Sequence, residues 1–204
     1  MLSFANAADS MTQATTWAMR GTVLLLLAAI CMNDLRSRRI PNRLVLSGLL
    51  IALAWQALGP VGAGLFHPVA PGALGLVPSL GGAAAAFAGF LLLYLMRTMG
   101  AGDVKLMAML GAFFGFEALP SLVLLVFLVG GVLVASRLFD GARRRAVFAN
   151  LQLIILGRFT ALSGAGVGPQ FDPRTDSADR LPYAFAISGG ALLLAALQLT
   201  GVIG

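Results

Sequence analysis

The sequence predicts an all-α polytopic membrane protein, a single bundle of about six transmembrane helices. The 204-residue chain is 59% hydrophobic, only 11% of its residues are charged, and its mean hydropathy is +0.91. A soluble domain carries about 25% charged residues. This composition is therefore typical of a protein surrounded by lipid and not by water. No stretch has the composition of a separate soluble domain. We therefore expect residues 1–204 to form one membrane-embedded domain.

The apolar stretches set the expected spans, since a span needs roughly 20 mostly apolar residues. They cover residues 15–32, 44–63, 73–96, 106–139 and 183–203. The stretch 106–139 is too long for one span, and Glu117 and Pro120 near its middle predict a turn that divides it in two. The span at 73–96 is rich in Gly and Ala, which let helices approach closely in lipid. We expect that span in the interior of the bundle.

The segments outside the spans carry less information. Residues 1–14 lack the basic start of a cleavable signal peptide and are expected to be an outer tail. Within an inner loop at 140–182, residues 146–156 are apolar but too short to span, which favours an interfacial helix and leaves a re-entrant segment open. Arg20 lies near the outer end of the first span, where it can snorkel. Cys31 is the only cysteine and is interpreted as a packing residue, with no disulfide and no zinc site expected.

The basic residues predict the orientation of the bundle. With six spans and the N-terminus outside, the inner segments hold 13 of the 14 Lys and Arg residues, and only Arg20 is left over. So strong a bias indicates that the basic segments face the cytoplasm and that both termini lie outside. The net charge of +6 is then explained by orientation and by contact with anionic lipid. Nucleic acid is not an expected partner.

Two aspartates are the candidate functional residues. Asp34 follows the first span and Asp103 precedes the fourth, so the parity of the spans places both at the inner face although they are 69 residues apart (103 minus 34). Ionisable residues at the edge of a membrane core are functional candidates by default. Two adjacent carboxyl groups share one proton, as aspartyl hydrolysis requires, without a metal or another cofactor. The pair titrates as a unit, so the roles of acid and base are not assigned separately.

A purely structural role for these two acids is the alternative. Asp103 could serve as the N-cap of the fourth span, and Arg36 could neutralise Asp34. The residues around Asp103 favour a site, because Gly100 and Gly102 leave room for the main chain of an extended substrate. Lys105 could tune Asp103 or anchor to lipid phosphate, and we favour anchoring.

The segment after Asp34 is a basic loop that includes Arg36, expected at the lipid headgroups. Pro41 and Asn42 should end this loop and start the second span. With Asp34, these residues form an Asp, basic stretch, Ile-Pro-Asn pattern.

The two motifs together resemble the type IV prepilin peptidase family of membrane aspartyl proteases. The first is similar to the family's Asp followed by a basic stretch and Ile-Pro-Asn, and residues 100–106 match its Gly-x-Gly-Asp-x-Lys-Leu signature. A weaker similarity is Pro182-Tyr183-Ala184, like the Pro-Tyr-Ala segment that opens the family's last span. The short form resembles the peptidases of Flp/Tad pilus systems, and the related archaeal preflagellin peptidases stay open.

The resemblance implies an activity, a partner and a place. Asp34 and Asp103 would be the catalytic pair of an enzyme of the bacterial cytoplasmic membrane that cuts the basic leader from prepilins at the cytoplasmic face. Larger family members also methylate the new N-terminus and carry paired cysteines in an extra N-terminal region. We expect this chain to have no methyltransferase activity. The oligomeric state is left open.

Two rival functions use the same residues differently. A small proton-linked transporter would place its acids near the membrane centre, whereas here both are expected at one edge. A non-enzymatic assembly subunit of a pilus or secretion system would keep the motifs without the chemistry. His67 in the outer loop and Glu117 near the outer turn are expected to lie far from the acid pair.

Overall fold

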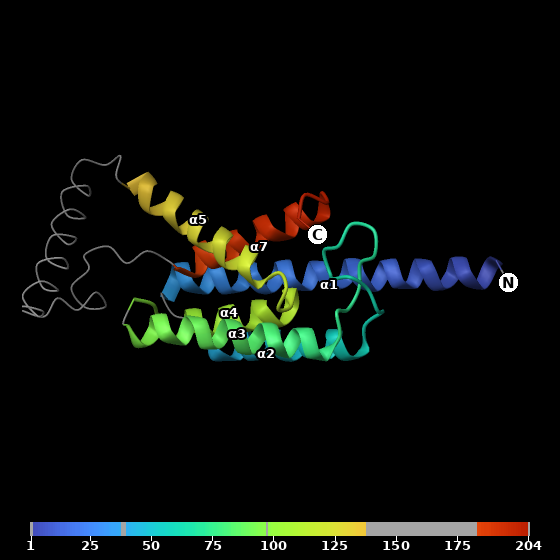
Figure 1. The fold of residues 1–204 in the computed structure, drawn as a ribbon, viewed down its shortest axis with the longest axis horizontal. Coiled ribbons are helices and arrows are strands. Elements are labelled where there is room, and N and C mark those ends of the chain that lie inside the picture. The colour runs from blue at the N-terminus through green and yellow to red at the C-terminus, as the bar shows by residue number, and fades with distance from the viewer. Residues whose placement is uncertain (1, 38–39, 97, 138–182, 204) are drawn as a thin grey trace, which may run out of the picture.

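The computed structural model describes residues 2–37, 40–96, 98–137 and 183–203, and this part of the chain folds into helices joined by short connections (Figure 1). The helices are α1 (Leu2–Ser37), α2 (Asn42–Leu58), α3 (Leu76–Leu95), α4 (Ala101–Phe114), α5 (Leu119–Arg137) and α7 (Tyr183–Leu199). Three segments are long and apolar enough to cross a membrane, namely Ser10–Ser37, Leu76–Leu95 and Leu119–Ser136, while α2 and α7 are shorter apolar helices. The expected polytopic all-α class is confirmed.

Helix α1 is much longer than the span expected at 15–32. It begins at Leu2, inside the expected tail, and its first turns project beyond the other helices (Figure 1). Its buried residues recur every three or four positions, which marks one continuous face turned toward the bundle. They are Thr16, Arg20, Val23, Leu27, Ile30 and Asp34, with Met19 buried beside Arg20. The face that packs in the core therefore leads directly to Asp34.

Helix α4 is the buried centre of the bundle. All its residues from Leu106 to Phe114 are buried, and it packs against α2, α3 and α7. At 14 residues it is short, and it ends at Gly115, whose φ of 78° favours glycine. Helix α5 begins four residues later, so the turn expected near Glu117 and Pro120 is confirmed: it covers residues 115–118, and Pro120 lies in the first turn of α5.

The expected central position of the Gly- and Ala-rich span is wrong. Helix α3 buries only one stripe, formed by Ser79, Gly82, Ala86 and Phe90, and exposes much of the rest. The small residues act on that stripe alone, since a Cβ on Gly82 would collide with the carbonyl oxygen of Gly111 in α4. The Gly- and Ala-rich composition of α3 correctly predicted close packing against a neighbouring helix. It did not predict how many faces of α3 would be packed in this way.

The connection between α2 and α3 closes the end of the bundle that is opposite to the start of α4. Leu65 and Phe66 are buried there, and the Phe66 ring stacks on Phe114 at 5.5 Å between centroids. Arg20 does not snorkel as expected. It is only 7% exposed, its Nε donates to the Leu65 carbonyl oxygen at 2.9 Å, and its guanidinium lies 4.7 Å from the centroid of the Trp17 ring. A loop carbonyl close to α1 gives the buried guanidinium a partner.

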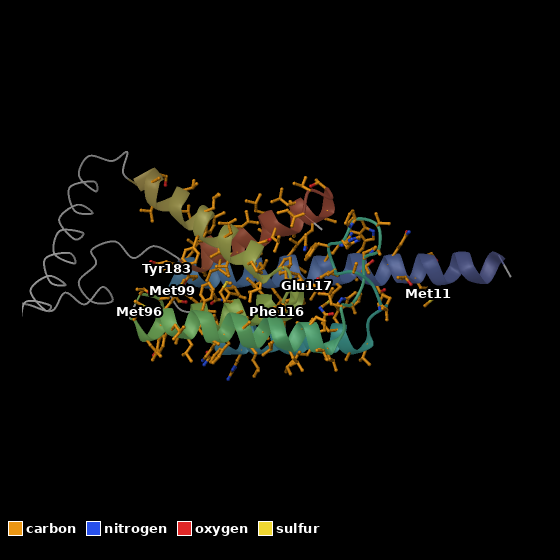
Figure 2. The ribbon with its side chains drawn as sticks, in the orientation of Figure 1. Met11, Met96, Met99, Phe116, Glu117 and Tyr183 are labelled. Carbon is orange, nitrogen blue, oxygen red and sulfur yellow. The ribbon has the colours of Figure 1, made fainter. Side chains whose placement is uncertain are left out.

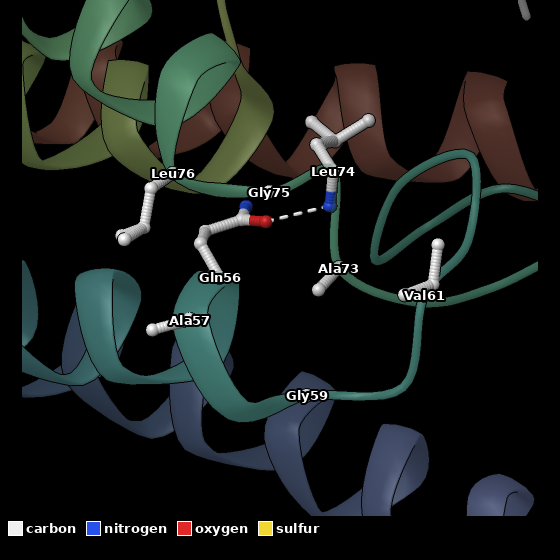
Figure 3. Close-up of a pocket in the computed structure, with 8 residues that line it drawn as sticks. All are labelled: Gln56, Ala57, Gly59, Val61, Ala73, Leu74, Gly75 and Leu76. Carbon is white, nitrogen blue, oxygen red and sulfur yellow. Dashed lines mark hydrogen bonds between the residues drawn. The ribbon is translucent and has the colours of Figure 1, made fainter.

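Gln56 ties three segments together near the same end. Its Nε2 donates to the carbonyl oxygens of Ala112 and Phe113 in α4, at 3.3 and 3.2 Å, and its Oε1 accepts the Leu74 amide at 2.6 Å. Figure 3 shows the last of these bonds beside the cavity that Gln56 helps to line. A buried amide with these partners fixes the depth of α2 relative to α4.

The remaining predictions about chain segments have mixed outcomes. Asn42 begins α2 with Pro41 as the preceding cap residue, as expected. Helix α2 stops at Leu58, before Gly59 and Pro60, five residues short of the expected end, and α7 stops at Leu199. The expected interfacial or re-entrant segment at 146–156 lies outside the described residues.

Candidate active site

Asp34 is positioned by the last turns of α1. It lies one helical turn beyond Ile30 on the buried face of that helix, and its side chain is only 9% exposed. Arg36, two residues later in the same turn, is exposed. The helical repeat thus directs the acid into the bundle and the base outward.

Asp103 is positioned by the first turn of α4. It is the third residue of the helix and not its N-cap, which is Gly100. The Gly100 amide donates to Asp103 Oδ2 at 3.0 Å, and the carboxyl group is 8% exposed. This hydrogen bond fixes the rotamer of the side chain, and the helix N-terminus favours a negative charge there. Local capping and a role in a site are therefore compatible.

The fold brings the two acids to the same end of the bundle, which we call the aspartate end. Helix α1 finishes there and α4 starts there, and Asp34 lies close enough to Asp103 for its charge to act on that carboxyl group. Both side chains are buried, so the interaction is screened less than it would be in water. Two acids that are 69 positions apart in sequence therefore lie near enough to interact electrostatically.

The connection after Asp34 packs on the start of α4. The Ile40 side chain lies against Gly102, where an added Cβ would come within 3.1 Å of it. Lys105 Nζ donates to Asn42 Oδ1 at 3.0 Å. These two contacts join the motif around Asp34 to the motif around Asp103. Lys105 thus has a protein partner, an arrangement that neither interpretation from the sequence included.

The start of α7 lies at the aspartate end as well. Tyr183 is the first residue of α7, and Figure 2 shows it at the same end of the bundle as Met99, which comes shortly before α4. The charge of Asp103 also acts on the Tyr183 phenol. The sequence offered Tyr183 only as part of a weak motif similarity. The parity of the spans could have indicated that Tyr183 lies near the acids, because the last span also starts at the inner face.

Two cavities among the described residues lie elsewhere. One of about 340 Å³ is lined by Gln56 and by residues of the α2–α3 connection, and one of about 360 Å³ lies between the outer halves of α1 and α2. Gln56 contacts Ala112 and Phe113, nine and ten residues along α4 from Asp103, a rise of roughly 14 Å. Neither cavity is therefore the candidate site.

Two further polar residues lie where the sequence indicated. His67 in the α2–α3 connection accepts the amides of Val69 and Ala70 through Nδ1, at 3.3 and 3.0 Å. Glu117 is in the turn after α4, at the far end of that helix from Asp103 (Figure 2). Among the described residues, no group of three or more His, Cys, Asp or Glu side chains is arranged to hold a metal ion.

Comparison with known sequences gives one family. The model of the type IV leader peptidase family matches residues 22–135, more than half of the chain and a range that includes both aspartates. No solved structure matches.

Curated relatives agree with that match. A prepilin leader peptidase/N-methyltransferase of Dickeya chrysanthemi is 33% identical over 143 residues, covering 70% of this chain and 46% of its own length. Proteins of the same name from Aeromonas hydrophila and Xanthomonas campestris pv. campestris are 36% identical over 138 residues and 32% identical over 152 residues. These matches cover 61% and 72% of this chain, and 42% and 49% of the relatives. The chain thus spans less than half the length of these relatives.

Proposed function

Because this chain belongs to the type IV leader peptidase family, we propose that it is a membrane aspartic endopeptidase that removes the short basic leader from prepilin-like precursors. The observation that carries the proposal is that Asp34 and Asp103, two buried acids far apart in sequence, lie at one end of the bundle and near enough for their charges to interact. The relatives' names specify prepilin leaders, which supplies the substrate class.

The chemistry follows from two carboxyl groups that share one proton. The ionised carboxylate takes a proton from a water molecule as that water attacks the carbonyl carbon of the scissile bond. The neutral carboxyl group donates its proton toward the carbonyl oxygen and stabilises the tetrahedral intermediate. Collapse of the intermediate then breaks the C–N bond as a proton passes to the leaving amine. The Gly100 amide holds Asp103 Oδ2, so we assign Oδ1 to face the reacting groups.

We place this site at the cytoplasmic face of the bacterial inner membrane. Support comes from the sequence, in which 13 of 14 basic residues fall on the segments at the aspartate side of the spans. A prepilin leader precedes an apolar helix, so cleavage at that face would leave the helix in the bilayer. The rival transporter would need acids at mid-membrane, and a relay at one end of the bundle does not supply a path across it.

Substrate binding must overcome like charge. The aspartate end carries the exposed basic residues Arg36, Arg43 and Lys105 on its rim. Their positive charge repels a basic leader, so long-range electrostatic attraction does not guide the substrate to the site. We therefore assign most of the binding free energy to the apolar helix of the precursor, which packs among the helices of the enzyme, while anionic lipid screens the basic rim. A soluble leader peptide without the helix should be cut much less efficiently than the full precursor.

Co-expression with a candidate prepilin tests the function. Leader removal is followed as a mobility shift on a gel, for the parent chain and for Asp34→Asn and Asp103→Asn. Each of the two variants should abolish processing while the protein stays in the membrane. The matched control is Glu117→Gln, which neutralises an acid at the other end of α4 and should still cut. Processing that persists in both aspartate variants would eliminate the dyad, and its absence with the parent chain would favour an assembly subunit.

Two finer expectations concern the product and the precursor. Mass spectrometry of the new N-terminus would detect a methyl group, which we expect to be absent, whereas the relatives are named for both activities. A comparison of Flp-type precursors with other pilin precursors would test the expected preference for the former.

A further inference from the structure

We infer that Tyr183 is a third residue of the site, a positioning residue whose hydroxyl group donates a hydrogen bond to the Asp103 carboxylate. This inference rests on the proposed function, since it gives the residue a part in that reaction. It begins from the position of Tyr183 at the start of α7, which packs against α1, α4 and α5.

The height of Tyr183 in the bundle is fixed by its neighbour. Ala184 is fully buried, and its carbonyl oxygen lies 3.9 Å from Cys31 Sγ in α1. Helix α1 runs toward the aspartate end and α7 runs away from it, so Tyr183 lies one residue, about 1.5 Å, nearer to that end than Ala184, and Asp34 lies three residues, about 4.5 Å, nearer than Cys31. Tyr183 and Asp34 therefore differ in depth by only about 3 Å.

The ring of Tyr183 lies between the core and the surroundings. It is 44% exposed, so one side faces the protein and the other is accessible. Figure 2 shows it at the end of the bundle where α4 begins, and it lies near enough to Asp103 for that charge to act on its phenol. A neutral phenol can donate one hydrogen bond at this place. A donor to the carboxylate favours the ionised form and so helps to keep one acid of the pair charged.

The other titratable and charged groups near Tyr183 are few. Helix α1 contributes Asp34 and Cys31, and α4 contributes Asp103 and Lys105, of which Lys105 is bonded to Asn42. Among the side chains that the structure describes, α5 contributes none. A change at the Tyr183 hydroxyl should therefore act on the acid pair before it acts on anything else.

Kinetics of Tyr183→Phe test the role, with Tyr94→Phe as the matched control because Tyr94 and Tyr183 are the only tyrosines. The substrate is a full-length pilin precursor, and the enzyme is the full chain in detergent micelles. Tyr183→Phe should lower kcat by about 10-fold or more with a KM within about twofold of the parent. The acidic limb of its pH profile should move to higher pH, because the ionised acid loses a donor. Tyr94→Phe should leave both unchanged.

A spectroscopic measurement separates this inference from the function itself. In the Tyr94→Phe background, 3-fluorotyrosine supplied during growth labels position 183 alone. Its ¹⁹F resonance should shift as the acid pair titrates, and Asp103→Asn should remove that pH dependence. A resonance that ignores pH, or a Tyr183→Phe pH profile equal to that of the parent, would overturn the inference while cleavage by the dyad stands. Equal cleavage by the parent and Asp103→Asn would overturn the proposed function, and this inference with it.

Discussion

Ile40 lies directly against Gly102, so that the loop after the first candidate acid rests on the helix turn that carries the second. A Cβ on Gly102 would come within 3.1 Å of Ile40 Cβ and 3.3 Å of Ile40 Cδ1. Such approaches are tighter than ordinary van der Waals contact, so either residue must move if a methyl group is added. The contact therefore couples the placement of Asp34 to that of Asp103.

Gly102→Ala should reduce activity more than stability. The added methyl group would displace Ile40 by a few tenths of an ångström, and small misplacements of reacting groups are costly to a rate, here on the order of tenfold. The measurement is the rate of precursor cleavage together with the melting temperature in detergent. The control is Gly89→Ala in α3, where an added Cβ would meet nothing within 4 Å.

The double variant Gly102→Ala/Ile40→Ala refines this test. Shortening Ile40 makes room for the new methyl group, so the double variant should cut faster than Gly102→Ala alone. If the two substitutions lower the rate independently, their contact is not what aligns the acids.

The hydrogen bond between Lys105 and Asn42 predicts a measurable coupling. Lys105 Nζ lies 3.0 Å from Asn42 Oδ1, and both side chains are exposed. A double-mutant cycle of Asn42→Ala and Lys105→Met should give a coupling free energy of about 0.5–1.5 kcal/mol in unfolding. Additive effects would mean that water replaces the bond at no cost.

The sequence was sufficient to predict that the two acids lie at the same end of the bundle, because the order of the spans does not depend on how the helices pack. An even number of crossings, here the second and third spans, returns the chain to the same face, so the positions of Asp34 and Asp103 followed from counting spans. The spacing of Val23, Leu27, Ile30 and Asp34 also contains the helical repeat that turns the acid inward. The helical repeat is a local feature, and the membrane face follows from a simple count of spans. For that reason both can be predicted from one sequence.

The contacts between helices were not predictable in the same way. Arg20 was expected at the lipid interface, but its partner is the Leu65 carbonyl oxygen, a backbone atom 45 residues away. Composition favoured α3 as the central helix, whereas α4 occupies that position because its apolar residues cover every face. Such outcomes depend on which faces meet in three dimensions, and the order of apolar residues in each helix leaves several arrangements open.

Adjacent glycines in α3 should respond oppositely to the same substitution. Gly82→Ala places a methyl group against the backbone of Gly111 and Gly115, which cannot yield as a flexible side chain can. We expect the free energy of unfolding to fall by about 1–3 kcal/mol. Gly81→Ala meets only Phe116 Cβ at 3.8 Å and should be neutral or gain up to about 1 kcal/mol from helix propensity. Equal melting temperatures for the two variants would contradict the close packing of α3 on α4.

Single-cysteine labelling decides the orientation on which cytoplasmic cleavage depends. In a Cys31→Ser background, Ser37→Cys places a thiol at the exposed end of α1 beside the acids, and Val69→Cys places one on the connection at the opposite end, where Val69 is 87% exposed. A maleimide that cannot cross membranes should label Val69→Cys in spheroplasts and Ser37→Cys only in inverted vesicles. The reason is the charge bias, since moving the basic segments across the bilayer is unfavourable. The reverse pattern would put the acid pair outside the cell, and the proposed cytoplasmic cut would then be impossible even if both acids proved essential.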